Sequence, residues 1–503
     1  MAALRALFRL VAAMWILVRA DALAPRELDP LLPEAARAAA RLLRLFAGPG
    51  ARVGRPGERL ARTLERLGPV GIKLGQFLST RADILGAEFA ADLARLKDRL
   101  APFSTELAQA EIERALGSAP CCLVAELGEP VAAASLAQAH RARLRDGREA
   151  AVKILRPEIE RRVADDAAVL RLGARIVQSL VPRSRRLAPR AFAATVIRSL
   201  QLELDMRLEA AAADELGSIM EHDGFMSAPK VVWEGVARRV VVLEWAPGLP
   251  LSDPASLEQA GLDRPRLATN LICGFLTQAL DHGVFHADLH EGNLFVDTPA
   301  KLTAVDFGII GRLDAAERRY LAEILWGFLQ RDYRRVADVH FQAGYVSPDQ
   351  DSATFAQALR AVGEPVFGRN ASGLSMGKLL AQLFEVTAIF DMVLRPELVL
   401  LQKTMVTVEG VARRIDPNHD IWSAAEPVVR RWIERELSPT ASLRRFVHDA
   451  SAALRAMSRL VGAAAAADPR ASETPVEGGS PWLGFALGVL VAAAAFSAAL
   501  FLR

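Results

Sequence analysis

The 503-residue sequence has few cysteines, few tyrosines and almost no excess of one charge. Its three cysteines, Cys121, Cys122 and Cys273, form no C-x-x-C pair, which excludes a disulfide framework and a zinc ribbon and suits a reducing compartment. The formal net charge of +3 is too small to indicate a nucleic-acid partner, and none is expected. With 51% hydrophobic and 24% charged residues the chain is ordinary globular material, and its length predicts two or three structural units.

One long stretch near the C-terminus lacks charge altogether. Residues 482–502, WLGFALGVLVAAAAFSAALFL, have about the 20 residues that a helix needs to cross the hydrocarbon core of a bilayer. Trp482 lies where an interfacial aromatic residue is common, and a polar stretch with Pro, Gly and Ser precedes it. We therefore expect a single transmembrane anchor.

The N-terminus is also apolar but carries basic residues. Arg9 and Arg19 enclose only nine residues, and Arg5 adds a third positive charge nearby. This pattern favours an amphipathic helix that lies on a membrane surface. A cleaved signal peptide is the alternative, because small residues follow near Ala24.

The pattern of apolar residues changes twice along the chain. Residues 28–116 have the 3.6-residue apolar period of helices, with Gly and Pro breaks between them. Short runs typical of strands follow, at 122–128, 134–144 and 148–155, and a second strand pair is expected at 230–235 and 238–248. Helical stretches are expected at 157–179 and 189–220, and helices dominate from Pro250 to about Ser438.

Four polar residues occur in the order that phosphoryl transfer requires. Asp288 and Asn293 are five positions apart in FHADLHEGNLFV, and Asp306 opens a D-F-G triplet after an apolar run. Lys153 lies upstream in AAVKIL, which is typical of the strand that carries a phosphate-binding lysine. Each pattern is weak alone, but their order predicts that Lys153 binds phosphates, that Asp288 acts on the acceptor, and that Asn293 and Asp306 hold Mg²⁺.

The same loop permits a different chemistry. His286, Asp288 and His290 occupy alternate positions and could bind one metal ion if this segment were a strand. Gly292 indicates a loop instead, and no second cluster supplies further ligands. A metal hydrolase is therefore the weaker hypothesis, and the histidines are expected to brace the loop through backbone carbonyls.

The motifs together resemble those of the UbiB family of atypical kinase-like ATPases, which is linked to ubiquinone biosynthesis. The resemblance covers about residues 5–420. It is carried by K-x-G-Q (Lys73 to Gln76), by AAASLAQAH in place of a Gly-rich loop, by E-x-D (Glu203 and Asp205), and by HADLHEGN with DFG.

The resemblance implies roles for residues that the spacing alone leaves open. Lys73 and Gln76 would lie on a helical lid over the active site, with Lys73 contacting Glu203 and Asp205. By pattern alone these lid residues could equally be ordinary surface residues of an amphipathic helix. The nucleotide would be held by three groups of residues: the loop Ala132, Ala133, Ala134 and Ser135; Lys153, paired with Glu209; and the backbone of Leu243 to Trp245, including Glu244 and Trp245.

The expected architecture is α+β: a bilobal protein-kinase-like fold with an N-terminal helical extension over the active site and a C-terminal transmembrane helix. The expected boundaries are 1–116 for the extension, 117–248 for the N-lobe, 249–440 for the C-lobe, 441–480 for a helix and linker, and 482–502 for the anchor. The expected location is the bacterial inner membrane, with one C-terminal pass and the catalytic domain in the cytoplasm.

The leading hypothesis is a membrane-anchored atypical small-molecule kinase or ATPase that uses ATP and Mg²⁺. Its expected partners are ATP, membrane lipids, prenylated quinone precursors and other proteins of ubiquinone biosynthesis, and a homodimer stays open. Two alternatives keep the fold but change the role: a nucleotide-binding scaffold without turnover, and a conventional protein kinase, against which the lid motifs argue.

Overall fold

The computed structural model describes residues 2–23, 26, 34–49, 51–79, 85–93, 95–96, 100–117, 123–180, 188–259, 261–367, 390, 392 and 396–436. The chain divides into two compact units, Met1–Ile433 and Glu434–Arg503, and the contacts described below lie in the first. The expected anchor at 482–502 lies outside the described residues. Within the described part of the chain, no helix combines the length and apolar character that crossing a bilayer requires.

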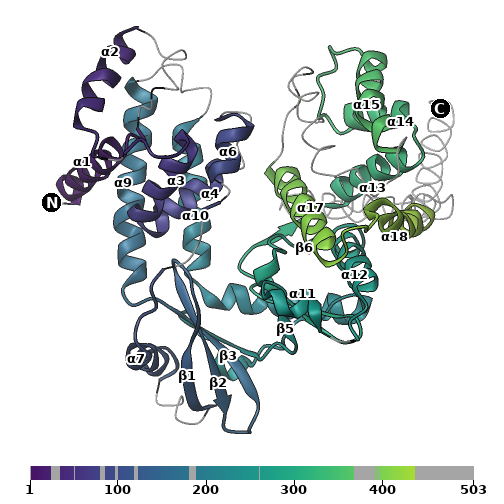
Figure 1. The fold of residues 1–503 in the computed structure, drawn as a ribbon, viewed down its shortest axis with the longest axis horizontal. Coiled ribbons are helices and arrows are strands. Elements are labelled where there is room, and N and C mark those ends of the chain that lie inside the picture. Colours follow the sequence, from purple (N-terminus) through teal and green to yellow (C-terminus); the bar gives the residue numbers. More distant parts are fainter. Residues whose placement is uncertain are drawn as a thin grey trace, which may run out of the picture. The chain divides into compact units, whose positions relative to one another are not determined.

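The N-terminal extension is helical, as its apolar period predicts. It consists of α1 (Ala2–Arg19), α2 (Glu34–Leu43), the short η2 (Arg44–Phe46), α3 (Pro56–Leu67), α4 (Pro69–Ser79) and α6 (Ala87–Leu93) (Figure 1). A small core of leucines joins α3, α4 and α6. Gly71 and Gly75 of α4 allow this close packing, since a Cβ at Gly71 would overlap the Leu64 carbonyl and one at Gly75 would overlap Leu64 and Leu96.

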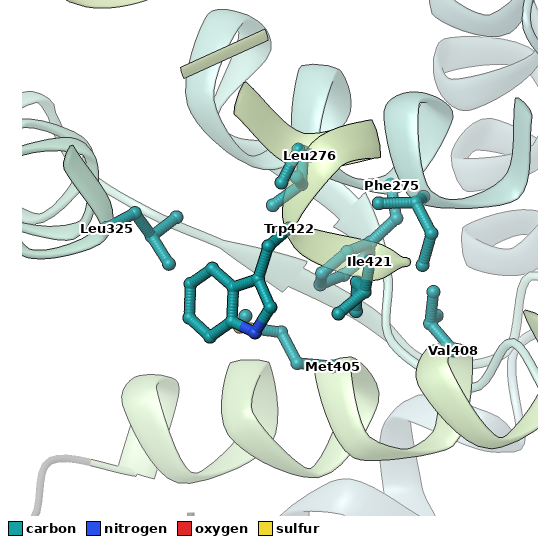
Figure 2. A pocket seen from close by; sticks show the side chains of 9 residues that line it. Phe275, Leu276, Leu325, Met405, Val408, Ile421 and Trp422 are labelled. Carbon is teal, nitrogen blue, oxygen red and sulfur yellow. The ribbon is translucent and has the colours of Figure 1, made fainter. Parts of the chain in front are cut away.

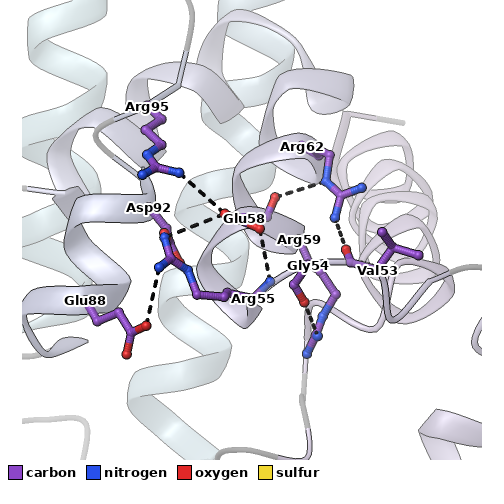
Figure 3. Close-up of polar contacts among 9 residues, drawn as sticks. All are labelled: Val53, Gly54, Arg55, Glu58, Arg59, Arg62, Glu88, Asp92 and Arg95. Carbon is purple, nitrogen blue, oxygen red and sulfur yellow. Dashed lines mark hydrogen bonds and ion pairs between the residues drawn. The ribbon is translucent and has the colours of Figure 1, made fainter.

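A charge network ties the start of α3 to α6 (Figure 3). Arg55 precedes α3 and binds the buried carboxylate of Asp92, with Glu88 and Glu58 beside it. Glu58 also accepts from the backbone N–H of Arg55 at 3.1 Å, which closes a capping box at the helix start. The network fixes the angle between the two helices, because a buried carboxylate needs a charged partner.

The small lobe is built on one antiparallel sheet in the order β1-β2-β3-β4. The strands are β1 (Val124–Ala133), β2 (Ala137–Leu144), β3 (Glu149–Leu155) and β4 (Val240–Glu244). Helix α7 (Thr105–Leu116) lies against this sheet (Figure 1) and buries Ala108 and Ile112 against Val152, Ile154 and Val242. The expected strands at 122–155 are therefore confirmed, and Arg145, Asp146 and Gly147 form the turn between β2 and β3.

The strand expected at 230–235 is confirmed only at its start. This segment contains the 3₁₀ helix η4 (Trp233–Gly235), and only Val231 pairs with the sheet, through a single bridge to Leu243. Gly235 has no room for a side chain, because a Cβ there would overlap Val242. The backbone at Gly235 therefore lies close to the Val242 side chain of β4.

In the described part of the chain, three α-helices lie between β3 and β4. They are α9 (Ile159–Leu180), α10 (Pro189–Glu203) and α11 (Met206–Asp223), so the single helix expected at 189–220 is broken at Leu204 and Asp205. Asp205 has extended backbone angles and its carboxylate accepts from the Arg207 N–H at 3.2 Å. An aspartate in this role starts a new helix, which explains the break.

The larger lobe holds short strands and many helices. Its strands are β5 (Leu249–Pro250), β6 (Val284–His286), β7 (Leu294–Asp297), β8 (Lys301–Ala304) and β9 (Ile310–Arg312), which form the sheets β5-β7-β8 and β6-β9. Its helices are η5 (Pro254–Glu258), α12 (Arg264–Thr277), η6 (Gln278–His282), η7 (Glu291–Asn293), α13 (Ala315–Leu329), α14 (Tyr333–Gln342), α15 (Ser352–Phe367), α17 (Pro396–Ile415) and α18 (Ile421–Glu436).

Helices α12, α13, α17 and α18 enclose a small apolar pocket (Figure 2). Phe275, Leu325, Met405 and Trp422 are among its lining residues. Trp432 of α18 donates its indole N–H to the Leu280 carbonyl at 2.8 Å, which joins the last described helix to the segment before β6. The pocket is part of the lobe's core and carries no polar group suited to catalysis.

Candidate functional site

Lys153 lies in the middle of the sheet, on the face opposite the core. Its neighbours Val152 and Ile154 are fully buried beneath α7, and alternation along β3 turns Lys153 to the other side. Lys153 Nζ lies 2.7 Å from Glu209 Oε1 and 2.8 Å from Asp306 Oδ1. The ion pair with Glu209 that the sequence predicts is present.

Glu209 reaches this position because α11 begins at Asp205. The cap places Glu209 in the first turn of α11, where the helix dipole favours a carboxylate. Burial raises the pKa of Glu209, against the opposing charge of Lys153. Because of the break between α10 and α11, Glu203 and Glu209 lie on different helices, and Glu209 is the one that pairs with Lys153.

Asp306 follows β8 in a left-handed backbone conformation, with φ of 63°. Such a conformation is strained for a residue other than glycine and is common at functional positions. The charge of Lys153 lowers the pKa of Asp306 to about 2. Burial alone would lower the pKa of Lys153, but Asp306 and Glu209 outweigh it and the pKa is raised. At neutral pH Lys153 is therefore an ammonium beside the ionised Asp306.

The catalytic loop runs from β6 through η7 and brings Asp288 and Asn293 together. Asn293 Nδ2 donates to the Asp288 carbonyl at 3.0 Å, so its Oδ1 is the atom left for a cation. The Val305 N–H donates to the Asn293 carbonyl at 2.9 Å, which places Asn293 beside the residue preceding Asp306. Asn293 and Asp306 thus carry side-chain oxygens of the kind that Mg²⁺ prefers, and their role as metal ligands stays a prediction.

His286 braces this loop with both ring nitrogens. Its Nδ1 accepts from the Asp288 N–H and its Nε2 donates to the Val305 carbonyl, each at 3.1 Å. Burial lowers the pKa of His286, which keeps the ring neutral, and the ring also packs on Phe307. The metal-hydrolase hypothesis fails here, because neither nitrogen of His286 is free to bind an ion, and the described residues contain no group of three or more His, Cys, Asp and Glu side chains that could hold one.

His290 has a separate role that its pattern does not reveal. Its Nδ1 accepts from the Gly292 N–H at 3.0 Å, so the ring begins η7 as a cap. Its Nε2 lies 3.8 Å from Asp288 Oδ2, beyond hydrogen-bond distance. The bracing role predicted for the histidines is thus confirmed for His286, whereas His290 binds a backbone N–H.

Helix α17 contacts the catalytic loop through Thr404 and Arg414, and no pattern in the sequence indicates these contacts. The buried Thr404 hydroxyl lies 3.0 Å from the Ala287 carbonyl and 2.8 Å from Leu400 O. Arg414 forms an ion pair with Glu291 of η7. Thr404 was missed because its partner is a backbone carbonyl far away in sequence, and a buried threonine in an apolar helix looks like core.

The alanine-rich loop is a tight turn between β1 and β2. The Ala134 N–H donates to the Ala137 carbonyl at 2.8 Å, and Ser135 is buried. Two outside donors occupy its carbonyls: Leu100 N–H binds Ala133 O at 3.1 Å, and Arg156 Nε binds Ala134 O at 2.9 Å. The loop is therefore held in place by groups that an ordinary Gly-rich loop does not need.

Glu244 and Trp245, between the lobes, have backbone N–H groups that already form hydrogen bonds within the protein. The Glu244 N–H donates to Lys230 O at 2.9 Å, and the Trp245 N–H donates to Glu149 O at 3.0 Å. Arg141 lies over the Trp245 ring, 4.9 Å from its centroid. Glu244 and Trp245 stay predicted nucleotide contacts, but their N–H groups are engaged by the sheet, so only their carbonyls can contact the adenine.

The predicted lid contacts are present in part. The buried ammonium of Lys73 on α4 forms an ion pair with Glu203, the last residue of α10. Asp205 binds Arg207 instead, at 2.6 Å, and this side-chain bond lowers the pKa of Asp205. The expected contact between Lys73 and Asp205 is therefore corrected to a helix cap. Gln76 lies on α4 one turn after Lys73, and the position of α4 over the active site stays a prediction.

The fold and the site define an atypical kinase-like protein. A family model described as the ABC1 atypical kinase-like domain matches residues 95–340, and one described as the UbiB helical domain matches residues 359–420. A relative from Marinobacter nauticus, named probable protein kinase UbiB, is 39% identical over 393 residues, which cover 77% of this chain and 72% of the relative. The chain belongs to the UbiB family, as its motifs predicted.

Other similar proteins include a second relative and a solved structure. The probable protein kinase UbiB of Xylella fastidiosa is 39% identical over 395 residues, covering 77% of this chain and 72% of the relative. The structure of a complex of Rv3197 with erythromycin from Mycobacterium tuberculosis is 20% identical, with a TM-score of 0.49. It covers 78% of this chain and 98% of that one.

Proposed function

We propose that this chain transfers the terminal phosphoryl group of ATP, either to water or to a small molecule, in support of ubiquinone biosynthesis. One observation carries the proposal: Lys153 is held between Glu209 and Asp306 at 2.7 and 2.8 Å, next to the loop that carries Asp288 and Asn293. This arrangement collects a phosphate-binding cation, its orienting carboxylate and oxygen ligands at one place.

The donor set suits ATP with Mg²⁺. Asp306 and the Oδ1 of Asn293 are hard oxygen ligands, and Lys153 is a cation that phosphate oxygens can take over from Asp306. When bound, Mg²⁺ would supply charge neutralisation on the transferred phosphoryl group. The residues present therefore fit both groups.

The chain's own residues divide the remaining work. Glu209 keeps Lys153 in place while the ammonium turns from Asp306 to the phosphates. The Asp288 N–H donates to His286 at 3.1 Å, and this bond holds the Asp288 backbone in place. The Asp288 carboxylate then faces the acceptor and can take up the acceptor's proton. Arg156 and Leu100 keep the alanine-rich loop from closing freely, which would restrict how a nucleotide is held.

The acceptor and the location belong to the same proposal. Family membership supports a prenylated quinone precursor as the substrate. The apolar run at 482–502 would keep the active site beside a membrane that contains such molecules, with the catalytic part in the cytoplasm of a bacterium.

The direct test is ATP turnover by the purified full chain, in anionic vesicles and with a quinone-precursor-like phenol present. Lys153→Ala and Asp306→Asn are each expected to lower turnover by about 100-fold or more, because each removes a charged group from the phosphates or the metal. Lys301→Ala and Asp214→Asn change the same residue types at exposed positions and should leave turnover unchanged. Unchanged turnover in Lys153→Ala would contradict the mechanism.

A second candidate role is a nucleotide-binding scaffold without turnover. The occupied carbonyls of Ala133 and Ala134 favour it, because a fixed loop closes poorly on phosphates. Complementation in cells separates the roles: Asp288→Asn should fail to support quinone synthesis if turnover matters and should succeed for a scaffold. Labelled phosphate transferred to a protein would indicate a protein kinase instead.

A further inference from the structure

The first helix carries large apolar side chains on the side turned away from the protein. Leu4, Phe8, Val11 and Trp15 repeat at intervals of three and four residues, so they lie along one side of α1. Their exposed fractions are 72%, 76%, 59% and 51%. A row of exposed apolar side chains of this size is unusual on a soluble surface and marks a contact with something else.

The opposite side of α1 packs on α9, and an ion pair fixes the helix rotation. Ala6 is buried, and Arg9 lies 2.7 Å from Asp165 and 2.6 Å from Asp166 of α9. Because the guanidinium binds both carboxylates, α1 cannot turn its apolar row inward without breaking two ion pairs. The row is therefore held outward by a specific contact.

The exposed surface continues from α1 onto η2. The Trp15 and Phe46 rings are in contact, with centroids 5.8 Å apart, and the Gly48 N–H donates to Arg19 O at 2.9 Å. Phe46 is 53% exposed and Leu45 is 77% exposed. We call this surface the N-terminal apolar face, made of Leu4, Phe8, Val11, Trp15, Leu45 and Phe46.

Three exposed arginines lie near the N-terminal apolar face. Arg5 and Arg19 are on α1, and Arg41 is on α2, which runs directly into η2. Asp21 is the one acidic residue within 2–49 whose side chain the structure describes, and it is buried beside Arg59. Among the side chains that the structure describes within 2–49, the accessible charge is thus positive.

We propose that the N-terminal apolar face docks onto an anionic lipid bilayer. Apolar side chains would enter the region between headgroups and acyl chains, Trp15 would lie at the interface, and the three arginines would meet lipid phosphates. A second copy of the chain fits less well, because a two-fold contact would bring the arginines of both copies together. The inference does not depend on phosphoryl transfer or on the segment 482–502.

The test measures where Trp15 lies in the full chain reconstituted into vesicles. The emission of Trp15 is obtained as the difference between the wild-type protein and Trp15→Phe, which keeps an aromatic side chain at that position. In vesicles of phosphatidylglycerol and phosphatidylcholine with brominated acyl chains, we expect most of this difference signal to be lost. In phosphatidylcholine alone the loss should be smaller.

Phe8→Glu and Leu45→Glu should restore the Trp15 signal, whereas Leu107→Glu, at a 50% exposed position of α7, should not. Far-UV circular dichroism and thermal unfolding show whether each variant is folded. Two outcomes would overturn the proposal. Emission that brominated lipid leaves intact but acrylamide quenches shows a face exposed to water. Blue-shifted emission that neither agent quenches shows a protein cover, either the C-terminal segment or a second copy.

Discussion

Lys153 is the residue at which three separate segments meet. It lies on β3, its first partner Glu209 lies in the first turn of α11, and its second partner Asp306 follows β8. One ammonium thus faces two carboxylates, one of them buried. Removing a shared cation of this kind leaves like charges close together, which costs more than the loss of one exposed ion pair.

We expect Lys153→Met to lower the free energy of unfolding by about 2 kcal/mol at about pH 8, less than for a fully buried pair because half of the Asp306 side chain is exposed. In the wild type the contribution of Asp306 is present above its ordinary pKa of 3.8 and is lost as the pH falls through about 2.

In the variant both carboxyl groups should take up protons at higher pH, so the stability difference should shrink between about pH 8 and pH 5. Thermal unfolding of both proteins at the two pH values checks this, with Lys301→Met as the exposed control. A difference that grows toward low pH would contradict the expected sign.

The residue scale also shows what spacing can and cannot predict. Lys153, Asp288, Asn293 and Asp306 were predicted from their order, because phosphoryl transfer needs these residue types in one order, whereas Glu209 was predicted from the resemblance to the UbiB family. The role of Asp205 was not predicted correctly. Its carboxylate has a closer partner in Arg207 and a backbone N–H to cap, and both follow from a helix break that the apolar period does not show.

At the scale of elements, α17 acts as a support for the catalytic loop. Thr404 contacts the Ala287 carbonyl, one residue before Asp288, from the buried side of the helix. The loop is otherwise held by His286 and by short strands. The position of Asp288 therefore depends on a helix that follows it by more than a hundred residues.

Thr404→Val keeps the shape of the side chain but removes its hydroxyl. We expect the Ala287 carbonyl to be left without this donor, ATP turnover to fall by about three- to ten-fold, and stability to fall by about 1 kcal/mol. Thr407→Val is the matched control, since the Thr407 hydroxyl binds only the Lys403 carbonyl one turn back in the same helix. Equal turnover in both variants would show that α17 does not position the loop.

Helix α4 depends on close packing at its glycines. In Gly75→Ala the new methyl group would overlap Leu64 and Leu96, and we expect a loss of about 1 to 2 kcal/mol after the gain in helix propensity. Gly410→Ala in α17 meets no atom within 4 Å and should gain up to about 1 kcal/mol. Denaturant unfolding of the two variants should therefore give opposite signs.

At the scale of the whole molecule, the N-terminal extension is joined to the small lobe through Lys73 and Glu203. A double-mutant cycle with Lys73→Met and Glu203→Gln should give a coupling energy of about 1 to 2 kcal/mol, because the Lys73 side chain is buried. The exposed pair of Arg312 and Glu215 serves as the control and should give about 0.5 kcal/mol or less. Equal coupling in the two cycles would mean that the extension is not tied to the lobe at this point.

The order of helices and strands could be predicted from the sequence better than the contacts that join them. The order of helices, sheet and helices followed from apolar periods, and the four-stranded sheet was placed within a few residues. The contacts that join these parts were not predictable. Three examples are the contacts of Arg156 with Ala134, of Thr404 with Ala287 and of Gly75 with Leu96. Each depends on a backbone group or on the space that a missing side chain leaves. Neither feature produces a recognisable pattern of residues in a single sequence.

The support that α17 gives to the catalytic loop has a consequence for inheritance. One family model ends at residue 340 and the next begins at 359, as if the chain were two exchangeable pieces. The Thr404 hydroxyl and the Arg414 side chain cross that division to Ala287 and Glu291. A relative that acquired only the segment matched by the first model would have Asp288 without α17, which contacts its loop. We therefore expect the two segments to be inherited together.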